Sequence, residues 1–102
     1  MDARARYDEI AAGLQARNDD VVLGQMMGMP AIKQGDKMIG GFWKDAMVFK
    51  LTAPPDLEGA LALEGAELFD PSEKGRPMRE WVAVPAQHAD AWPRLAERAL
   101  HR

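Results

Sequence analysis

The chain has 102 residues, and 13 lysines and arginines against 16 aspartates and glutamates give it a formal net charge of −3. One domain with one hydrophobic core fits this length, so we expect residues 1–102 to form a single domain. The absence of cysteine excludes disulfide scaffolds, thiolate zinc sites and cysteine nucleophiles, and no run approaches the ~18 apolar residues of a membrane span.

The first half of the chain predicts one helix followed by strands. Apolar residues recur at helical spacing over 3–14, and Asp2 stands where it can cap the helix. Residues 21–51 consist of short apolar runs separated by Gly-containing or charged turns, which predicts a meander of four antiparallel strands. Because Gly24 and Pro30 interrupt the first of these runs, we expect its strand to be short or bulged.

The second half predicts two more strands and two more helices. The expected elements are a helix over 56–63, a brief apolar segment over 66–69, a strand over 78–84 and a helix that begins near Asp90. The resulting order, α-β-β-β-β-α-β-β-α, predicts an α+β fold. Its natural form is a curved, mainly antiparallel sheet with the helices packed on one face.

Two residues on the predicted strands admit a sharper interpretation. We expect Trp81 to face the helices, where a tryptophan buries about 150–250 Å², and the alternative is a contact residue on the open face. Gly40 and Gly41 lack the spacing of a phosphate-binding loop. They predict a bulge or a place where another element approaches the backbone closely.

Groups able to perform catalysis or bind a metal are few. Ser72 is the only serine, and His88 and His101 are the only histidines, without the spacing of a nucleophile motif or a metal site. We therefore expect no enzyme activity, no catalytic residue, no metal and no cofactor. The basic residues form no patch along the chain, so we also expect no direct nucleic-acid binding.

The methionines and one basic loop are the strongest candidates for a binding surface. Six methionines fall in or near the predicted strands, where they either fill the core or line an adaptable binding surface. Lys74, Arg76 and Arg79 form either a receptor for an acidic partner or part of a solvated loop with neighbouring acids. The candidate interaction surface consists of Met26, Met27, Gly28, Lys74, Arg76 and Met78.

Three segments carry a resemblance to a known family. Residues 25–30, Gln-Met-Met-Gly-Met-Pro, are similar to a Met-Phe-Gly signature, and the hairpins of 31–51 are similar to the strands that follow it. Residues 75–78, Gly-Arg-Pro-Met, with Glu-Trp-Val at 80–82, are similar to a late loop and strand. With the last helix, these segments resemble the N-terminal domain of the TfoX/Sxy competence-regulator family over nearly the whole chain.

The resemblance implies an α+β domain and a regulatory role. Longer members of the family regulate natural competence with a cyclic-AMP-responsive transcription activator and carry a second, helical domain, whereas this chain corresponds to the first domain. We therefore expect a small bacterial, cytoplasmic, non-enzymatic domain that binds another protein.

Two alternatives stay open at this point. One is a small-molecule-binding domain with an apolar pocket lined by Trp43, Trp81 and methionines. The other concerns association, because an apolar patch or an open edge strand would be buried in a homodimer. The residues do not decide between a monomer and a homodimer.

Overall fold

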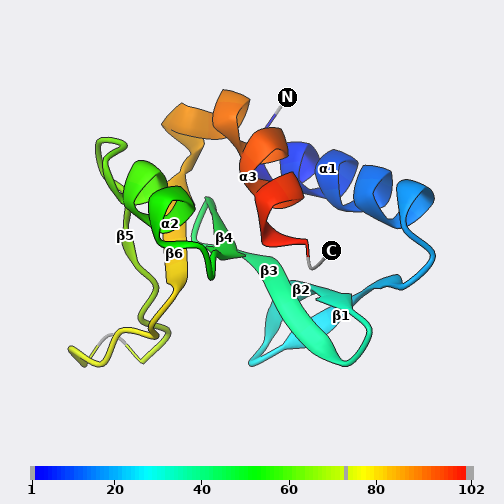
Figure 1. Ribbon diagram of the computed structural model, residues 1–102, viewed down its shortest axis with the longest axis horizontal. Helices are drawn as coiled ribbons and strands as arrows, with labels where there is room; N and C mark the ends of the chain where they lie inside the picture. The colour runs from blue at the N-terminus through cyan, green and yellow to red at the C-terminus, as the bar shows by residue number, and fades with distance from the viewer. Residues whose placement is uncertain (1, 73, 101–102) are drawn as a thin grey trace.

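One open six-stranded antiparallel sheet, with helices packed on one of its faces, organises the chain (Figure 1). The structure is a computed structural model and describes residues 2–72 and 74–100. Its elements are α1 (Ala3–Arg17), β1 (Val21–Met26), β2 (Met29–Gln34), β3 (Lys37–Trp43), β4 (Ala46–Lys50), α2 (Pro54–Leu61), β5 (Glu67–Leu68), β6 (Trp81–Pro85), the 3-10 helix η1 (Ala86–Ala91) and α3 (Trp92–Ala99). The strands lie in the order β1-β2-β3-β4-β6-β5, and the predicted α+β class is confirmed.

Helix α1 forms for the reasons that its sequence predicts. The Asp2 carboxylate accepts a hydrogen bond of 2.7 Å from the Ala5 N–H and so caps the first turn. At the other end the Asn18 side-chain amide donates to the Leu14 carbonyl at 2.9 Å. The buried residues recur three and four positions apart and face the sheet. They are Tyr7, Ile10, Ala11 and Leu14.

Strand β1 is longer and more regular than we expected. It runs for six residues and pairs with β2 in one continuous register, in which Gly24 lies opposite Ala31. The turn that joins the two strands consists of Met27 and Gly28, both with positive φ, 54° and 76°. A two-residue turn of this kind matches the twist of the strands, so the glycines do not shorten β1.

The irregularity lies between β2 and β3 instead, as Gly40 and Gly41 predict. Ile32 pairs with Gly40 and Lys33 pairs with Met38, which leaves one extra residue on β3 and makes a bulge. A Cβ on Gly41 would lie 2.5 Å from the Met29 Cε atom and 2.7 Å from the Pro30 carbonyl oxygen. Only glycine fits so close to a neighbouring strand.

The face of the sheet that the helices cover holds the larger core. Its buried residues come from α1, α2, α3 and every strand of the sheet except β5. Met47, Phe49 and Leu51 alternate along the chain and lie together on this face. The fully buried Trp92 of α3 donates its indole N–H to the Val84 carbonyl at 3.1 Å, which ties the last helix to β6.

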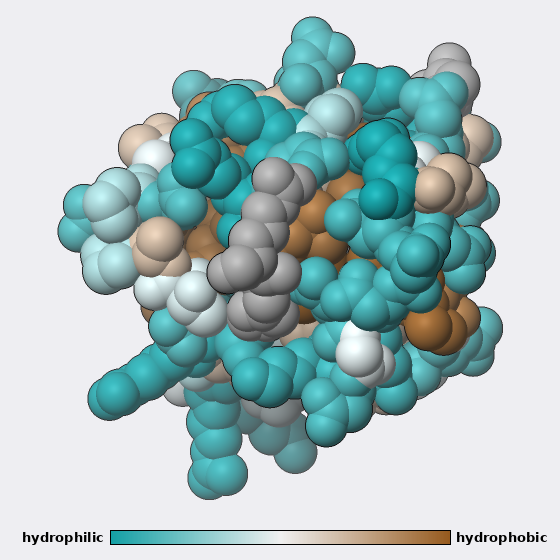
Figure 2. All heavy atoms as spheres, turned by 45° about the vertical axis from the view of Figure 1, so that its right-hand side comes forward, coloured by the Kyte–Doolittle hydropathy of each residue, from teal (hydrophilic) through white to brown (hydrophobic). Residues whose placement is uncertain are grey.

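The opposite face of the sheet holds a second, smaller core. Its buried residues are Met29, Val48, Phe69 and Trp81. The cover on this side comes from the connection between β5 and β6 rather than from a helix. In another view, hydrophilic residues cover most of the visible surface, with hydrophobic residues showing between them (Figure 2).

Trp81 belongs to this second core, so the prediction that it faces the helices is wrong. Lys50 pairs with Trp81 and Phe49 pairs with Val82, and paired residues share a face of a sheet. Because Phe49 faces the helices, Val82 does too, and Trp81 points the other way. It is buried there nevertheless, with only 7% of its surface exposed.

The two ends of the last strand also differ from the prediction. Strand β6 begins at Trp81 rather than at residue 78, because Glu80 has a positive φ of 66° that an extended strand does not allow. Asp90 lies within η1 and does not cap the final helix, which begins at Trp92. Pro93 lies in the first turn of α3, where the missing N–H of a proline costs little.

Candidate functional site

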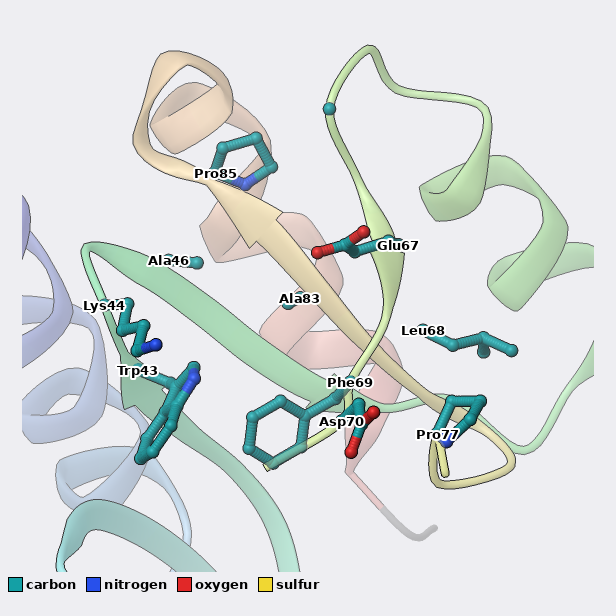
Figure 3. A pocket seen from close by; sticks show the side chains of 11 residues that line it. Trp43, Lys44, Ala46, Glu67, Leu68, Phe69, Asp70, Pro77, Ala83 and Pro85 are labelled. Atoms are coloured by element: carbon teal, nitrogen blue, oxygen red, sulfur yellow. The ribbon is translucent and has the colours of Figure 1, made fainter. Parts of the chain in front are cut away.

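An open cleft of about 690 Å³ lies beside the second core, on the face of the sheet that the helices leave free (Figure 3). Residues from three stretches far apart in the sequence line it: Trp43, Lys44 and Ala46 at the β3–β4 turn, five residues within 65–70 around β5, and Ala83 and Pro85 of β6. Pro77 adds one more contact from the β5–β6 connection. The pairing of β6 with both β4 and β5 brings these stretches together.

The floor of the cleft consists of small side chains. Ala46 pairs with Pro85, and Ala83 pairs with Val48 two positions further along β4. Ala46, Pro85 and Ala83 therefore share the face that carries the second core. With only methyl groups on two of these positions, a bound molecule can approach the backbone of β4 and β6.

An aromatic pair forms one wall. The ring centroids of Trp43 and Phe69 are 5.9 Å apart with an interplanar angle of 72°, an edge-to-face arrangement. Phe69 is buried, and the backbone anchors it on both sides, because its N–H donates to the Trp81 carbonyl at 2.9 Å and its carbonyl accepts from the Met78 N–H at 2.8 Å. Trp43 is only half-buried, so part of its indole ring is accessible from the cleft.

Opposite charges stand on the two sides of the cleft. The Lys44 ammonium lies 5.6 Å from the centroid of the Trp43 ring, within the range of a cation–π contact. Glu67 extends from β5 on the other side, with its carboxylate directed toward Ala83 (Figure 3). Both residues are exposed. The rim can therefore interact with a ligand that carries both a negative and a positive group.

Asp70 closes one end of the cleft by holding a loop in place. Its carboxylate accepts hydrogen bonds from the Ser72 hydroxyl at 2.6 Å and from the backbone N–H groups of Ser72, Gly75 and Arg76 at 3.1, 2.9 and 3.0 Å. These bonds, the one from the Ser72 hydroxyl first, hold the pKa of Asp70 below its ordinary value. The same bonds fix the path of the loop that leads to Pro77.

The surface that the sequence predicts falls into two parts outside this cleft. Met26, Met27 and Gly28 form the exposed end of the β1–β2 hairpin, and Lys74 and Arg76 lie exposed on the β5–β6 connection. None of these five residues contributes to the cleft lining.

Met78 and Met29 show that both parts of the predicted surface lie next to the second core. Met78 is half-buried and packs against the second core. Met29, which directly follows the β1–β2 turn, is one of the buried residues of the same core. The two parts of the predicted surface therefore border one core, and Met78 itself lies outside the cleft lining.

The apolar pocket of the alternative prediction is only partly present in the cleft. Trp43 lines it, whereas Trp81 is buried in the core beside it and is not among the lining residues. Lys44 and Glu67 were missed because nothing in the sequence relates a turn residue to a two-residue strand. The one sequence feature that could have indicated the cleft is Trp43 followed by Lys44 at a tight turn, because the turn itself does not need an aromatic residue.

The described residues present little that could perform catalysis. The Ser72 hydroxyl binds Asp70, and the His88 Nε2 atom lies 2.8 Å from the Glu64 carbonyl oxygen, so the two side chains have different partners. His101 lies outside the described residues. Over residues 2–72 and 74–100, no three acidic or histidine side chains gather as a metal site would require. Nor does this part of the chain hold a helix long and apolar enough to cross a membrane.

Comparisons with models of protein families, with curated proteins and with solved structures find no match to this chain. The resemblance to the TfoX/Sxy family therefore stays a prediction that rests on the segments 25–30, 31–51 and 75–82. The geometry of the cleft and of the sheet is the basis for assigning a function.

Proposed function

We propose that this protein is a non-catalytic binding domain, and that a segment of another protein occupies the cleft over β4 and β6. The observation that carries the proposal is the form of the cleft, which is open to solvent and lined by residues of four strands and their connections. A pocket for a small molecule encloses most of its ligand. An open cleft suits a chain segment that continues beyond it on either side.

The lining supports a peptide as the ligand. The exposed part of Trp43 offers an apolar surface for one side chain, and the small floor residues Ala46 and Ala83 leave room for a backbone. Lys44 and Glu67 can attract opposite charges of a peptide from the two sides. Binding of this kind requires no catalytic group.

A library of short random peptides tests the proposal. The immobilised protein selects peptides from the library, and isothermal titration measures the binding of those enriched. We expect Ala46→Met to weaken their binding by tenfold or more, because the longer side chain fills the floor of the cleft. Ala12→Met makes the same chemical change at an exposed position of α1, on the opposite face, and should leave binding unchanged.

The selection can contradict the proposal in two ways. One is that no peptide is enriched over a bare support. The other is that the enriched peptides bind wild type, Ala46→Met and Ala12→Met equally, in which case they use another surface.

A small molecule is the second candidate for the same cleft, and the accessible ring of Trp43 favours it. Trp92 is fully buried and Trp81 nearly so, which leaves Trp43 as the tryptophan most sensitive to a ligand. Fluorescence titration with a mixed set of metabolites distinguishes this candidate. A saturable change that Trp43→Phe removes, in the absence of any peptide binding, would favour the small molecule.

The proposal also includes a cellular role for the domain. We infer a regulatory role in a bacterial cytoplasm from the resemblance to the TfoX/Sxy N-terminal domain, with a protein as the partner. The candidate surface at Met27 and Arg76 is part of this inference. Arg76→Glu, compared with wild type in the peptide selection, tests whether the exposed loop contributes to binding. Homodimer formation is also a proposal, which the geometry of β1 makes specific.

A further inference from the structure

Exposed hydrophobic side chains gather on one edge of the sheet. Among the described residues five large hydrophobic side chains are exposed, and four of them lie on β1 or its turn. They are Val22 (53% exposed), Leu23 (38%), Met26 (41%) and Met27 (53%). Strand β1 is the first strand of the sheet and pairs only with β2, so its other edge is free. It also lacks the charges, prolines and bulges that protect edge strands.

The turn of the hairpin determines which backbone groups point to the free edge. In a hairpin closed by a two-residue turn, the flanking residues form a hydrogen-bonded pair, and bonded and non-bonded pairs alternate from there. Because Met26 and Met29 flank the turn, Leu23 and Gln25 fall in non-bonded pairs. Pro30 lies opposite Gln25 and has no N–H to donate, which agrees with this alternation. The N–H and C=O groups of Leu23 and Gln25 therefore point outward.

We propose that two copies of this chain associate through antiparallel pairing of their β1 strands, with the two-fold axis at Gly24. In this register Leu23 of each copy forms a hydrogen-bonded pair with Gln25 of the other, so all the outward groups of both residues are used. The two Gly24 residues face each other at the axis. Nothing lies within 4 Å of the position of a Gly24 Cβ, so the free face of the sheet is uncovered at this point.

The same register buries the exposed side chains against each other. Val22 of one copy lies opposite Met26 of the other, on the face of the sheet that the helices leave free. Both are exposed apolar side chains in the single copy, and each contact occurs twice because of the symmetry. The two six-stranded sheets become one continuous sheet.

A second copy fits this edge better than an unrelated peptide does. The register is complementary to itself in both backbone groups and side chains, and β1 carries no charge that would repel its equivalent, although the chain as a whole is at −3. The contact is small, because two six-residue strands cover less than the ~1,200–2,000 Å² of a stable interface. We therefore expect association that depends on concentration in the micromolar to millimolar range.

A charge-pair experiment tests both the association and its register. Sedimentation equilibrium measures the average mass of wild type, Val22→Glu, Met26→Lys and the double variant that carries both changes. For wild type we expect a rise from 11.3 kDa toward twice that mass with concentration. Each single variant should stay a monomer, because a charge then meets an apolar side chain. The double variant should associate again, because the introduced carboxylate of one copy meets the introduced ammonium of the other at both contacts.

Each other outcome overturns the proposal. A wild-type mass that stays at 11.3 kDa up to millimolar concentration excludes the dimer, single variants that associate like wild type exclude this edge, and a double variant that stays monomeric excludes this register. Amide hydrogen exchange tests the pairing in the wild-type protein, without any substitution. The Leu23 and Gln25 amides should gain protection as the protein concentration rises, and unchanged exchange there would contradict the pairing. The cleft does not include β1, so the peptide experiment and this one can fail separately.

Discussion

The two faces of the sheet differ in what covers them. On one face three helices bury eighteen of the described residues in a single cluster, including the fully buried Trp92. On the other face, the connection between β5 and β6 buries only four, among them Trp81. The cleft lies on this second face, and it also carries Val22 and Met26 of the apolar edge.

This difference in cover explains where the two proposed binding surfaces lie. A helix with a periodic apolar stripe covers a sheet continuously, so the first face has little apolar surface left for a partner. A loop contributes side chains at irregular positions. Phe69 and Trp81 cover the middle of the second face, and the space between Trp43 and Glu67 stays open. The β5–β6 connection covers only part of the second face, so a partner could bind there while the main core under the helices stays intact.

The largest expected effect separates the two buried tryptophans, Trp92 and Trp81. Trp92→Ala should lower the free energy of unfolding by about 5 kcal/mol, because it leaves a cavity in the main core and removes the bond to Val84. Trp81→Ala should cost about 3 kcal/mol, since the loop over the smaller core can move to close part of the cavity. Urea unfolding measures both values. An equal or larger loss for Trp81→Ala would show that the second core is as rigid as the first.

A pH dependence at alkaline pH should belong to the helix-covered face. Burial raises the pKa of Tyr7 from 10.0 to about 12, with smaller effects of the Arg4 and Asp8 charges. The folded state therefore keeps this proton more tightly than the unfolded state does. Its contribution to stability is complete below pH 10 and is lost as the pH rises toward about 12. The loss should reach about 2–3 kcal/mol, at about 1.4 kcal/mol per pH unit.

Tyr7→Phe isolates this contribution, because it removes only the phenolic hydroxyl group. The aromatic ring, whose centroid lies 5.5 Å from that of Phe42, is kept. Urea unfolding of both proteins measures the difference at several pH values, from about 9, which lies below the ordinary tyrosine pKa, up to about 12. The stability of wild type should fall relative to that of Tyr7→Phe as the pH rises, so the difference between the two curves should change by this amount. Curves that stay parallel would mean that the Tyr7 hydroxyl is not desolvated in the folded state.

The smallest effect should be local to the loop on the second face. Asp70→Asn removes the negative charge that accepts four hydrogen bonds from Ser72, Gly75 and Arg76. We expect trypsin to cleave after Lys74 several-fold faster, with little change in the melting temperature, because the exposed loop can loosen without unfolding the core. Asp36→Asn, in an exposed turn, serves as the matched control. Equal cleavage of all three proteins would assign no ordering role to the Asp70 charge.

Features that depend on local pattern could be predicted from the sequence. The apolar stripe of α1 identified its buried face, and the position of Asp2 before this stripe identified the cap. Gly41 signalled the close approach of β2 because no other residue type tolerates it. In each case neighbours within a few positions determine the outcome.

Features that depend on pairing between distant segments could not be predicted. The alternation from Trp81 to Val84 allows two orientations, and only the register with β4 selects one of them. The extra length of β1 depends on a turn in which Met27, a residue unusual at positive φ, takes the place that Asn or Gly commonly occupies. The cleft joins Lys44 to Glu67 through β6, and no pattern near either residue indicates the other.

The long connection between β4 and β6 has a consequence for how the cleft comes into existence. Strands β1 to β4 follow one another in short hairpins, whereas β6 pairs with β4 only after the chain has passed through residues 51–80 (Figure 1). Contacts that close a long loop form late in folding and are among those lost in partial unfolding. A molecule that occupies the cleft contacts residues on both sides of this loop, so it shifts the equilibrium toward the completed sheet. Binding at the cleft, as proposed, would therefore be linked to the last step of folding.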